Sequence, residues 1–135
     1  MLIFREPTES DFALMADSFW RGAIDACPGV GRLFLVSMLE RAIRDPSWHM
    51  AIMCDDGTQD EILCWGIWKN RHEVFWIATS PRYQLSDLHF GNAMFEHIGI
   101  KADSIVSCVA IPRGMWATAA RHNVRLLHRP YMALT

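Results

Sequence analysis

The hydrophobic positions of this chain follow two periods that alternate along the sequence. After a short apolar run at 2–5, apolar side chains recur at intervals of three and four residues, at Phe12, Met15, Phe19 and Ala23. That spacing predicts a helix ending near residue 26, with Thr8 as its N-cap and acidic residues in its first turn. The same period predicts a second helix over about 32–44, which an Asp-Pro pair ends.

The middle of the chain holds apolar runs that are nearly continuous. We expect strands over 48–54, 61–68 and 74–79, separated by an Asp-Asp-Gly turn and by a polar Lys-Asn-Arg-His turn. The runs at 62–68 and 74–78 lack polar alternation, so these two strands should be buried on both faces, at the centre of a sheet that helices cover on each side. Gly66, inside the second strand, predicts either a bulge or a close approach of another part of the backbone.

The last third of the chain alternates between helices and strands. We expect a helix over about 87–98, a strand over 104–111, a short helix over 114–122 and a final strand over 126–133. The whole order predicts a single domain over residues 1–135. Its class is α/β (α+β), with a mixed, mostly antiparallel sheet of about six strands and helices on both faces.

Composition narrows the class of protein. About half of the residues are apolar, with six Trp, seven Phe and eight Met, which excludes a disordered chain. No apolar run approaches the roughly 20 residues of a membrane helix. The N-terminus has no basic region ahead of an apolar core, so we expect a soluble cytosolic protein without a secretory signal. Six tryptophans are many for so small a core, and exposed ones would favour an interface.

The four cysteines form no Cys-x-x-Cys pair, and each lies among apolar neighbours: Cys27, Cys54, Cys64 and Cys108. This pattern predicts reduced cysteines packed in the core. Cys54 and Cys64 flank a predicted hairpin and could face each other, but a reducing compartment favours packing over a disulfide.

Charge is spread unevenly along the chain, although the net charge is only −2. Residues 1–61 hold eleven acidic and five basic side chains, whereas residues 62–135 hold four and eight. No acidic residue follows Asp103, and four arginines do. This asymmetry indicates an anionic ligand or an acidic partner on the C-terminal side, with plainly solvated arginines as the alternative.

The order of the predicted elements and four short motifs resemble the GNAT superfamily of N-acetyltransferases. The similarity extends over nearly the whole chain and is closer to the short GNAT-like proteins of tailed bacteriophages. The motifs are Ile3-Phe-Arg-Glu-Pro-Thr-Glu-Ser-Asp-Phe, Asp17-Ser-Phe-Trp-Arg, Asp60-Glu-Ile-Leu-Cys-Trp and His128-Arg-Pro-Tyr131.

The resemblance implies an acetyl-CoA site. GNAT enzymes hold the pyrophosphate with an Arg/Gln-x-x-Gly-x-Gly/Ala loop, whose backbone N–H groups face the phosphates at a helix N-terminus. Gly91-Asn92-Ala93 matches the last half of that pattern. The cofactor-binding residues that the resemblance assigns are Ile77, Thr79, Arg82, Gly91, Asn92 and Ala93.

The first half of the loop motif is broken. Leu88 stands where the family has Arg or Gln, and if Arg82 takes that place, Leu85 falls where a glycine should be. Asp87 would set a negative charge beside a polyanion, and Ser86 or Asp87 could instead cap the helix.

The resemblance also implies two catalytic groups. Glu73 could act as the general base through water, and Tyr131 could protonate the departing thiolate. The alternatives are a solvated carboxylate at a strand end and a tyrosine packed beside Pro130. His89 and His97 share a predicted helix face without a third ligand, so no metal site is expected.

Two functions remain open from the sequence. We favour a catalytically degenerate phage protein without a cofactor, which acts as a virion or assembly component or as a protein-binding module. The alternative is an active N-acetyltransferase that uses acetyl-CoA. Protein partners, from the phage particle or the host, are expected, and an oligomer is left open. We expect no membrane partner, and we place the protein in the host cytoplasm or on the virion. A nucleic-acid partner is disfavoured by a pI of about 6.3.

Overall fold

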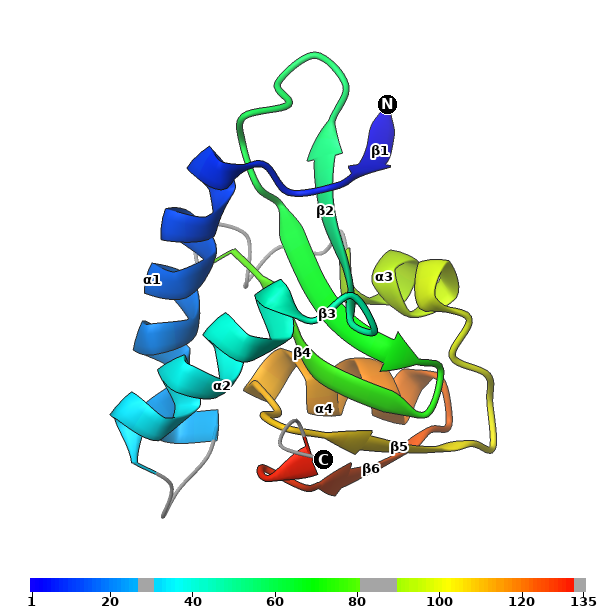
Figure 1. Ribbon diagram of the computed structural model, residues 1–135. Helices are drawn as coiled ribbons and strands as arrows, with labels where there is room; N and C mark the ends of the chain where they lie inside the picture. Colours follow the sequence, from blue (N-terminus) through cyan, green and yellow to red (C-terminus); the bar gives the residue numbers. More distant parts are fainter. Residues whose placement is uncertain (27–30, 81–89, 133–135) are drawn as a thin grey trace.

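The computed structural model describes residues 1–26, 31–80 and 90–132. Within these ranges the elements follow in the order shown in Figure 1: β1 (Leu2–Arg5), α1 (Glu9–Ala26), α2 (Arg32–Arg44), β2 (His49–Asp55), β3 (Cys64–Asn70), β4 (Glu73–Thr79), α3 (Phe90–Ile98), β5 (Ile105–Cys108), α4 (Arg113–Arg121) and β6 (Arg125–His128). None of the described helices is both long and apolar enough to span a membrane.

The six described strands form one open sheet in the order of the sequence, from β1 to β6. The first four strands pair antiparallel with one another, whereas β5 pairs parallel with both β4 and β6. The prediction of a mixed, mostly antiparallel sheet of about six strands is therefore confirmed.

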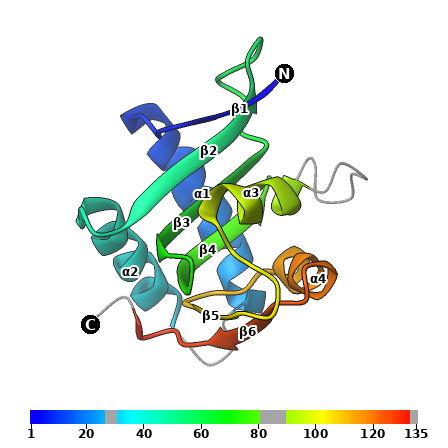
Figure 2. The ribbon, with the colours of Figure 1, turned by 90° about the vertical axis from the view of Figure 1, so that its right-hand side faces the viewer.

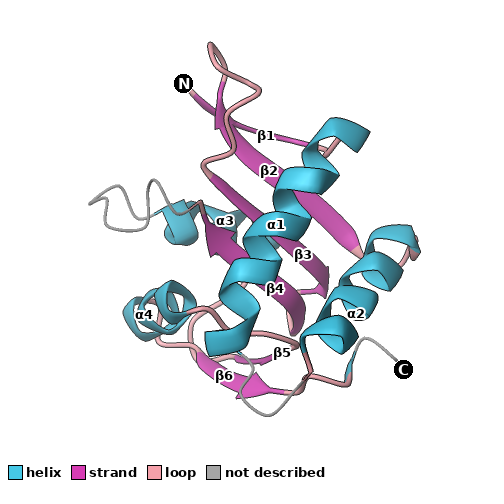
Figure 3. Cartoon of the chain, turned by 90° about the vertical axis from the view of Figure 1, so that its left-hand side faces the viewer, coloured by secondary structure: helices cyan, strands magenta, loops and turns pink. Residues whose placement is uncertain are grey.

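Neighbouring residues of a central strand enter different cores, because successive side chains of a strand point to opposite faces. Trp65 and Ile67 of β3 pack in a cluster with α1 and α2, while Cys64 packs in a second cluster with α3 and α4. Figure 2 shows α3 crossing in front of the sheet with α1 behind it, and Figure 3 shows α1 in front.

The atoms nearest to the Cβ position of Gly66 belong to side chains, and not to the backbone whose close approach its position predicts. A Cβ atom at Gly66 would lie 3.3 Å from both the Met94 sulfur and an Ile77 side-chain carbon, so α3 sits directly over β3 here. The irregularities in the β3–β4 ladder lie elsewhere, because its register skips Phe75 on β4 and Lys69 on β3.

Three strands are shorter than the apolar runs predict. β3 begins at Cys64 because a turn, closed by the Glu61 N–H to the Thr58 carbonyl, occupies the residues before it. β5 ends at Cys108, where the chain leads into α4, and β6 ends at His128, before the turn at Pro130. A proline supplies no N–H to a ladder. The expectation that the last strand continues to 133 is therefore wrong.

The described cysteines are free and buried, as predicted: Cys54, Cys64 and Cys108. Cys27 lies outside the described residues. Cys54 and Cys64 do not face each other, because Met53 is the direct partner of Cys64 and the side chain of Cys54 points to the other face of the sheet. Burial raises the pKa of the Cys64 and Cys108 thiols to about 12, so both stay protonated at neutral pH.

A nearly buried ion pair connects β1, α1 and the β2–β3 hairpin. The Arg5 guanidinium donates to both Asp11 carboxylate oxygens, at 2.7 and 3.0 Å, and also to the Gln59 carbonyl at 2.8 and 3.0 Å. Asp11 further accepts from the Thr8 backbone N–H at 2.7 Å, which is one half of the capping box that the sequence suggests. These bonds lower the pKa of Asp11 to about 2, with the Arg5 hydrogen bond as the largest cause.

We expect Asp11→Asn to cost about 2 kcal/mol at pH 7, the value that corresponds to the lowered pKa. Because the folded-state pKa lies below the ordinary value of 3.8, this stabilisation is present above about pH 3.8 and is lost as pH falls towards 2. Urea unfolding of both proteins at pH 7 and at low pH measures it.

Asp17→Asn is the matched control, because Asp17 pairs with Arg21 on the surface of the same helix. An exposed pair of this kind contributes about 0–1 kcal/mol. Equal losses for the two variants at pH 7, or an Asp11→Asn loss that persists unchanged at low pH, would contradict the prediction.

Candidate functional site

One open pocket brings together the two residues predicted to be catalytic. It has a volume of about 530 Å³ and lies where the start of β4, the middle of β5 and the segment after β6 meet. Its lining consists of Glu73, Ser107, Arg129, Pro130, Tyr131 and Met132. Ser107 and Arg129 were not singled out in the sequence as site residues, and only the run of C-terminal arginines hinted at the second.

Glu73 is held at the mouth of this pocket by the sheet and by one side chain. It is the first residue of β4, opposite Asn70 of β3 and Ser107 of β5. Its Oε1 accepts a hydrogen bond from Asn70 Nδ2 at 2.9 Å, and Asn70 Oδ1 in turn accepts from the His72 N–H. The turn that joins β3 and β4 therefore orients this half-buried carboxylate.

Tyr131 does not lie on a strand, contrary to the prediction, but in the turn after β6. Its ring packs against Phe34 of α2, with ring centroids 5.3 Å apart, and 59% of the residue is exposed. Within the described residues its hydroxyl makes no hydrogen bond. The pocket thus combines a carboxylate, a guanidinium and a phenol on an apolar floor, a set that can bind a small polar molecule such as an amine.

Beyond the pocket, β4 and β5 separate. Their pairing is limited to Glu73 with Ser107 and Val74 with Cys108, and backbone hydrogen bonding continues only to the Ala110 N–H, which donates to the Phe75 carbonyl at 3.1 Å. The register shift at Phe75 in the β3–β4 ladder lies where this separation begins.

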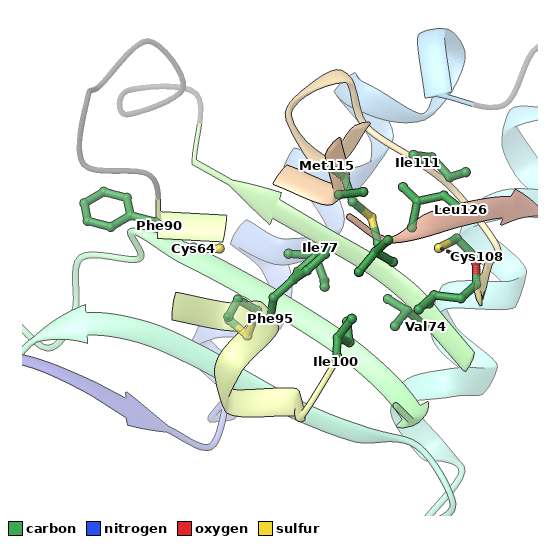
Figure 4. Close-up of a cluster of buried hydrophobic side chains, with 14 of the residues drawn as sticks. Cys64, Val74, Ile77, Phe90, Phe95, Ile100, Cys108, Ile111, Met115 and Leu126 are labelled. Carbon is green, nitrogen blue, oxygen red and sulfur yellow. Dashed lines mark hydrogen bonds between the residues drawn. The ribbon is translucent and has the colours of Figure 1, made fainter. Parts of the chain in front are cut away.

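Ile77 and Thr79 lie on the part of β4 that β5 has left. The Ser80 N–H donates to the Leu63 carbonyl, on the side of β3. Because the backbone groups of successive strand residues point alternately to the two sides, the N–H and C=O groups of Ile77 and Thr79 point away from β3. The Ile77 side chain is buried in the cluster between α3 and α4, with Ile111 and Met115, as Figure 4 shows. Packed side chains therefore occupy the space beside this part of β4.

The predicted phosphate-binding residues Gly91, Asn92 and Ala93 form the first turn of α3. A Cβ at Gly91 would lie only 2.6 Å from Thr118 Oγ1 of α4, so the absence of a side chain is what lets the two helices approach. Thr118 is nearly fully buried, and its hydroxyl donates to the Gly114 carbonyl at 3.0 Å. The packing of α3 against α4 is therefore enough to explain why residue 91 is a glycine.

The side chain of Asn92 also forms hydrogen bonds with residues at the end of α4. Its Oδ1 accepts from Arg121 Nη2 at 3.2 Å and from Arg121 Nε at 3.3 Å, and it lies 3.2 Å from His122 Nε2. Arg121 additionally donates to Thr118 Oγ1 at 3.1 Å. This polar bridge brings a positive charge to the first turn of α3, where helix N–H groups favour anions. The sequence analysis did not connect Arg121 or His122 with this turn.

The remaining expectations concern the loop and the histidines. Arg82, Leu85, Asp87, Leu88 and His89 lie outside the described residues. His97 stacks on Phe4, with ring centroids 3.9 Å apart and planes 7° from parallel, so its ring is held by packing. The described part of the chain contains no group of three His, Cys, Asp or Glu side chains that could hold a metal ion.

Comparisons of the chain with protein-family models, with curated proteins and with solved structures returned no match.

We expect Gly91→Ala to destabilise the protein by about 1–3 kcal/mol, because the new methyl group overlaps the Thr118 hydroxyl. Chemical denaturation measures the loss, which should shrink in a Thr118→Ala background. Gly114→Ala is the matched control: it is the second residue of α4, as Gly91 is of α3, and its Cβ meets nothing within 4 Å. There the higher helix propensity of alanine should leave stability unchanged or raise it by up to about 1 kcal/mol. If both variants behave alike, packing does not explain Gly91.

Proposed function

We propose that the chain is a GNAT-fold phage protein that has lost acetyl transfer and acts as a virion or assembly component or a protein-binding module. The observation that carries this proposal is that the first turn of α3 packs against α4 and forms hydrogen bonds with it. The Thr118 hydroxyl occupies the space that a side chain at residue 91 would need, and the Asn92 side chain is hydrogen-bonded to Arg121 and His122. A pyrophosphate at this turn would have to share these groups with α4.

The fold supports the family part of the proposal. Three antiparallel strands, a helix after the fourth strand, and parallel pairing of β4 with β5 agree with the element order on which the resemblance rests. Clusters of buried side chains that join α1 and α2 to one set of sheet residues, and α3 and α4 to another, agree with helices on both faces. Phage origin rests on the sequence motifs alone.

A binding role is supported by large apolar side chains at the surface. Leu33 is 78% exposed, Tyr131 59% and Trp116 50%. Tryptophan and tyrosine are enriched in the centres of protein interfaces, where they contribute much of the binding energy. Trp48, Trp65 and Trp76 are buried and Trp68 is partly buried, so Trp116 is the most exposed of the tryptophans whose burial the structure describes.

The alternative function, N-acetyl transfer with acetyl-CoA, is favoured by one observation. Glu73 and Tyr131, far apart in the sequence, line the same pocket beside the separation of β4 and β5. In this case Glu73 would accept the amine proton through water, and Tyr131 would return a proton to the thiolate of coenzyme A.

Calorimetric titration of the full chain with acetyl-CoA at millimolar concentration separates the two functions. The degenerate protein should give no binding heat and no acetylation of polyamines or lysine peptides. Micromolar binding of acetyl-CoA together with acetylation of either substrate would contradict our proposal.

If acetylation is detected, Glu73→Gln should lower kcat by about 10²–10⁴, the usual contribution of general base catalysis. Tyr131→Phe should lower kcat in the same assay without unfolding the protein. Glu96→Gln, an exposed carboxylate on α3, is the control and should leave kcat unchanged. Activity that survives both pocket substitutions would exclude the assigned roles.

A further inference from the structure

One end of the molecule is acidic. The β2–β3 hairpin and the start of α1 meet there, because Arg5 joins the Gln59 carbonyl to Asp11 (top of Figure 1). Both positive groups at this end are already paired, the N-terminal ammonium with Asp55 at 3.2 Å and Arg5 with Asp11 at 2.7 Å. Four exposed carboxylates have no ion pair within the described residues: Glu6, Glu9, Asp56 and Asp60.

The opposite end is basic. It consists of α4, β5 and β6 (bottom of Figure 1), and no acidic residue occurs from Ser104 onwards. Four exposed arginines lie there, and none forms an ion pair within the described residues: Arg113, Arg121, Arg125 and Arg129. The hydrogen bonds that Arg121 makes go to neutral oxygens, which leaves its charge uncompensated.

Each end also presents apolar side chains beside its charges. Met1 is 87% and Leu2 48% exposed at the acidic end, while Trp116 is 50% and Ile105 49% exposed at the basic end. Along α4, the exposed residues Arg113, Trp116, Ala117, Ala120 and Arg121 form one stripe at helical spacing. Tryptophan flanked by arginine is typical of an interface centre.

We propose that copies of this chain associate head to tail, with the acidic end of one copy against the basic end of the next. The occupant of the basic end is a second copy because the same chain carries a surface of opposite charge at its other end. The four arginines of the basic end outnumber the carboxylates beside them, Glu73 and Asp103. Two different patches meet in such a contact, so it is heterologous and extends to rings or open chains. The inference goes beyond the proposed function, since it holds whether or not the chain binds acetyl-CoA.

Sedimentation velocity of the full-length protein tests the electrostatic origin of the contact. At an ionic strength of about 0.01 M, where the screening length is about 30 Å, the sedimentation coefficient should rise with protein concentration. At about 1 M, where the screening length is about 3 Å, the protein should sediment as a monomer. A monomer under both conditions would overturn the proposal.

Charge reversal at each end identifies the two surfaces. Glu6→Lys/Asp60→Lys and Arg113→Glu/Arg125→Glu change side chains that make no hydrogen bond or ion pair within the described residues, so both variants should fold. Each variant alone should remain monomeric at low salt. An equimolar mixture should associate at low salt, because the intact basic end of the first variant meets the intact acidic end of the second.

Glu40→Lys/Glu96→Lys is the matched control for net charge, because it adds the same four units as Glu6→Lys/Asp60→Lys at exposed positions of α2 and α3. It should associate as the unaltered chain does. Loss of association in this control, or a mixture of the two reversal variants that stays monomeric, would overturn the proposal. So would a monomeric chain that binds a single-stranded oligonucleotide through Arg113 and Arg125, since the basic end would then serve nucleic acid.

Discussion

The structure depends on the way β4 pairs with its two neighbours. On one side, β4 follows β3 antiparallel along its whole length, and on the other it meets β5 in parallel at Glu73 and Val74 only. The register of β4 with β3 shifts at Phe75, the residue that follows the last pair between β4 and β5. Everything after Phe75 therefore leaves the β5 side, while the pairing with β3 continues to Thr79.

This divergence separates two regions that a GNAT enzyme would need to connect. The pocket with Glu73 and Tyr131 lies where β4 and β5 are still paired. The first turn of α3, with Gly91, follows the far end of β4. Between them, Ile77, Ile111 and Met115 are buried in one cluster. The pocket with Glu73 and Tyr131 is thus separated by packed side chains from the first turn of α3, which itself packs against α4.

The separation of charge between the two ends of the molecule does not follow from the packing of the core. At the acidic end the fold pairs Arg5 and the N-terminus with carboxylates, so that only unpaired negative charges remain towards solvent. At the basic end no carboxylate is available in the sequence after Asp103. Long-range attraction between such ends depends on ionic strength and adds specificity more than affinity. The exposed Trp116 offers the apolar contact that charges alone do not provide.

The sequence by itself determined the elements and the sheet class. Apolar period and turn residues placed the four helices and six strands that the structure describes, with errors at strand ends such as 61–63 and 129–132, where turns interrupt an apolar run. They also placed Thr8 at the start of α1, since a helix cap depends on neighbours along the chain. Reduced, buried cysteines followed from their apolar surroundings in the same way.

Only the tertiary structure decided what the site residues contact. Nothing local to Gly91 reveals that Thr118 fills its place, and nothing near Asn92 reveals Arg121 and His122, because these partners come from α4. The meeting of Glu73 with Tyr131, and the opposite faces of Cys54 and Cys64, depend on strand register, which pairing between distant segments sets. The sequence likewise shows the charge asymmetry, but only the fold shows that the acidic and basic residues lie at two different ends of the molecule. Local sequence specifies periodicity and backbone conformation, whereas contacts between distant residues arise only when the elements pack together.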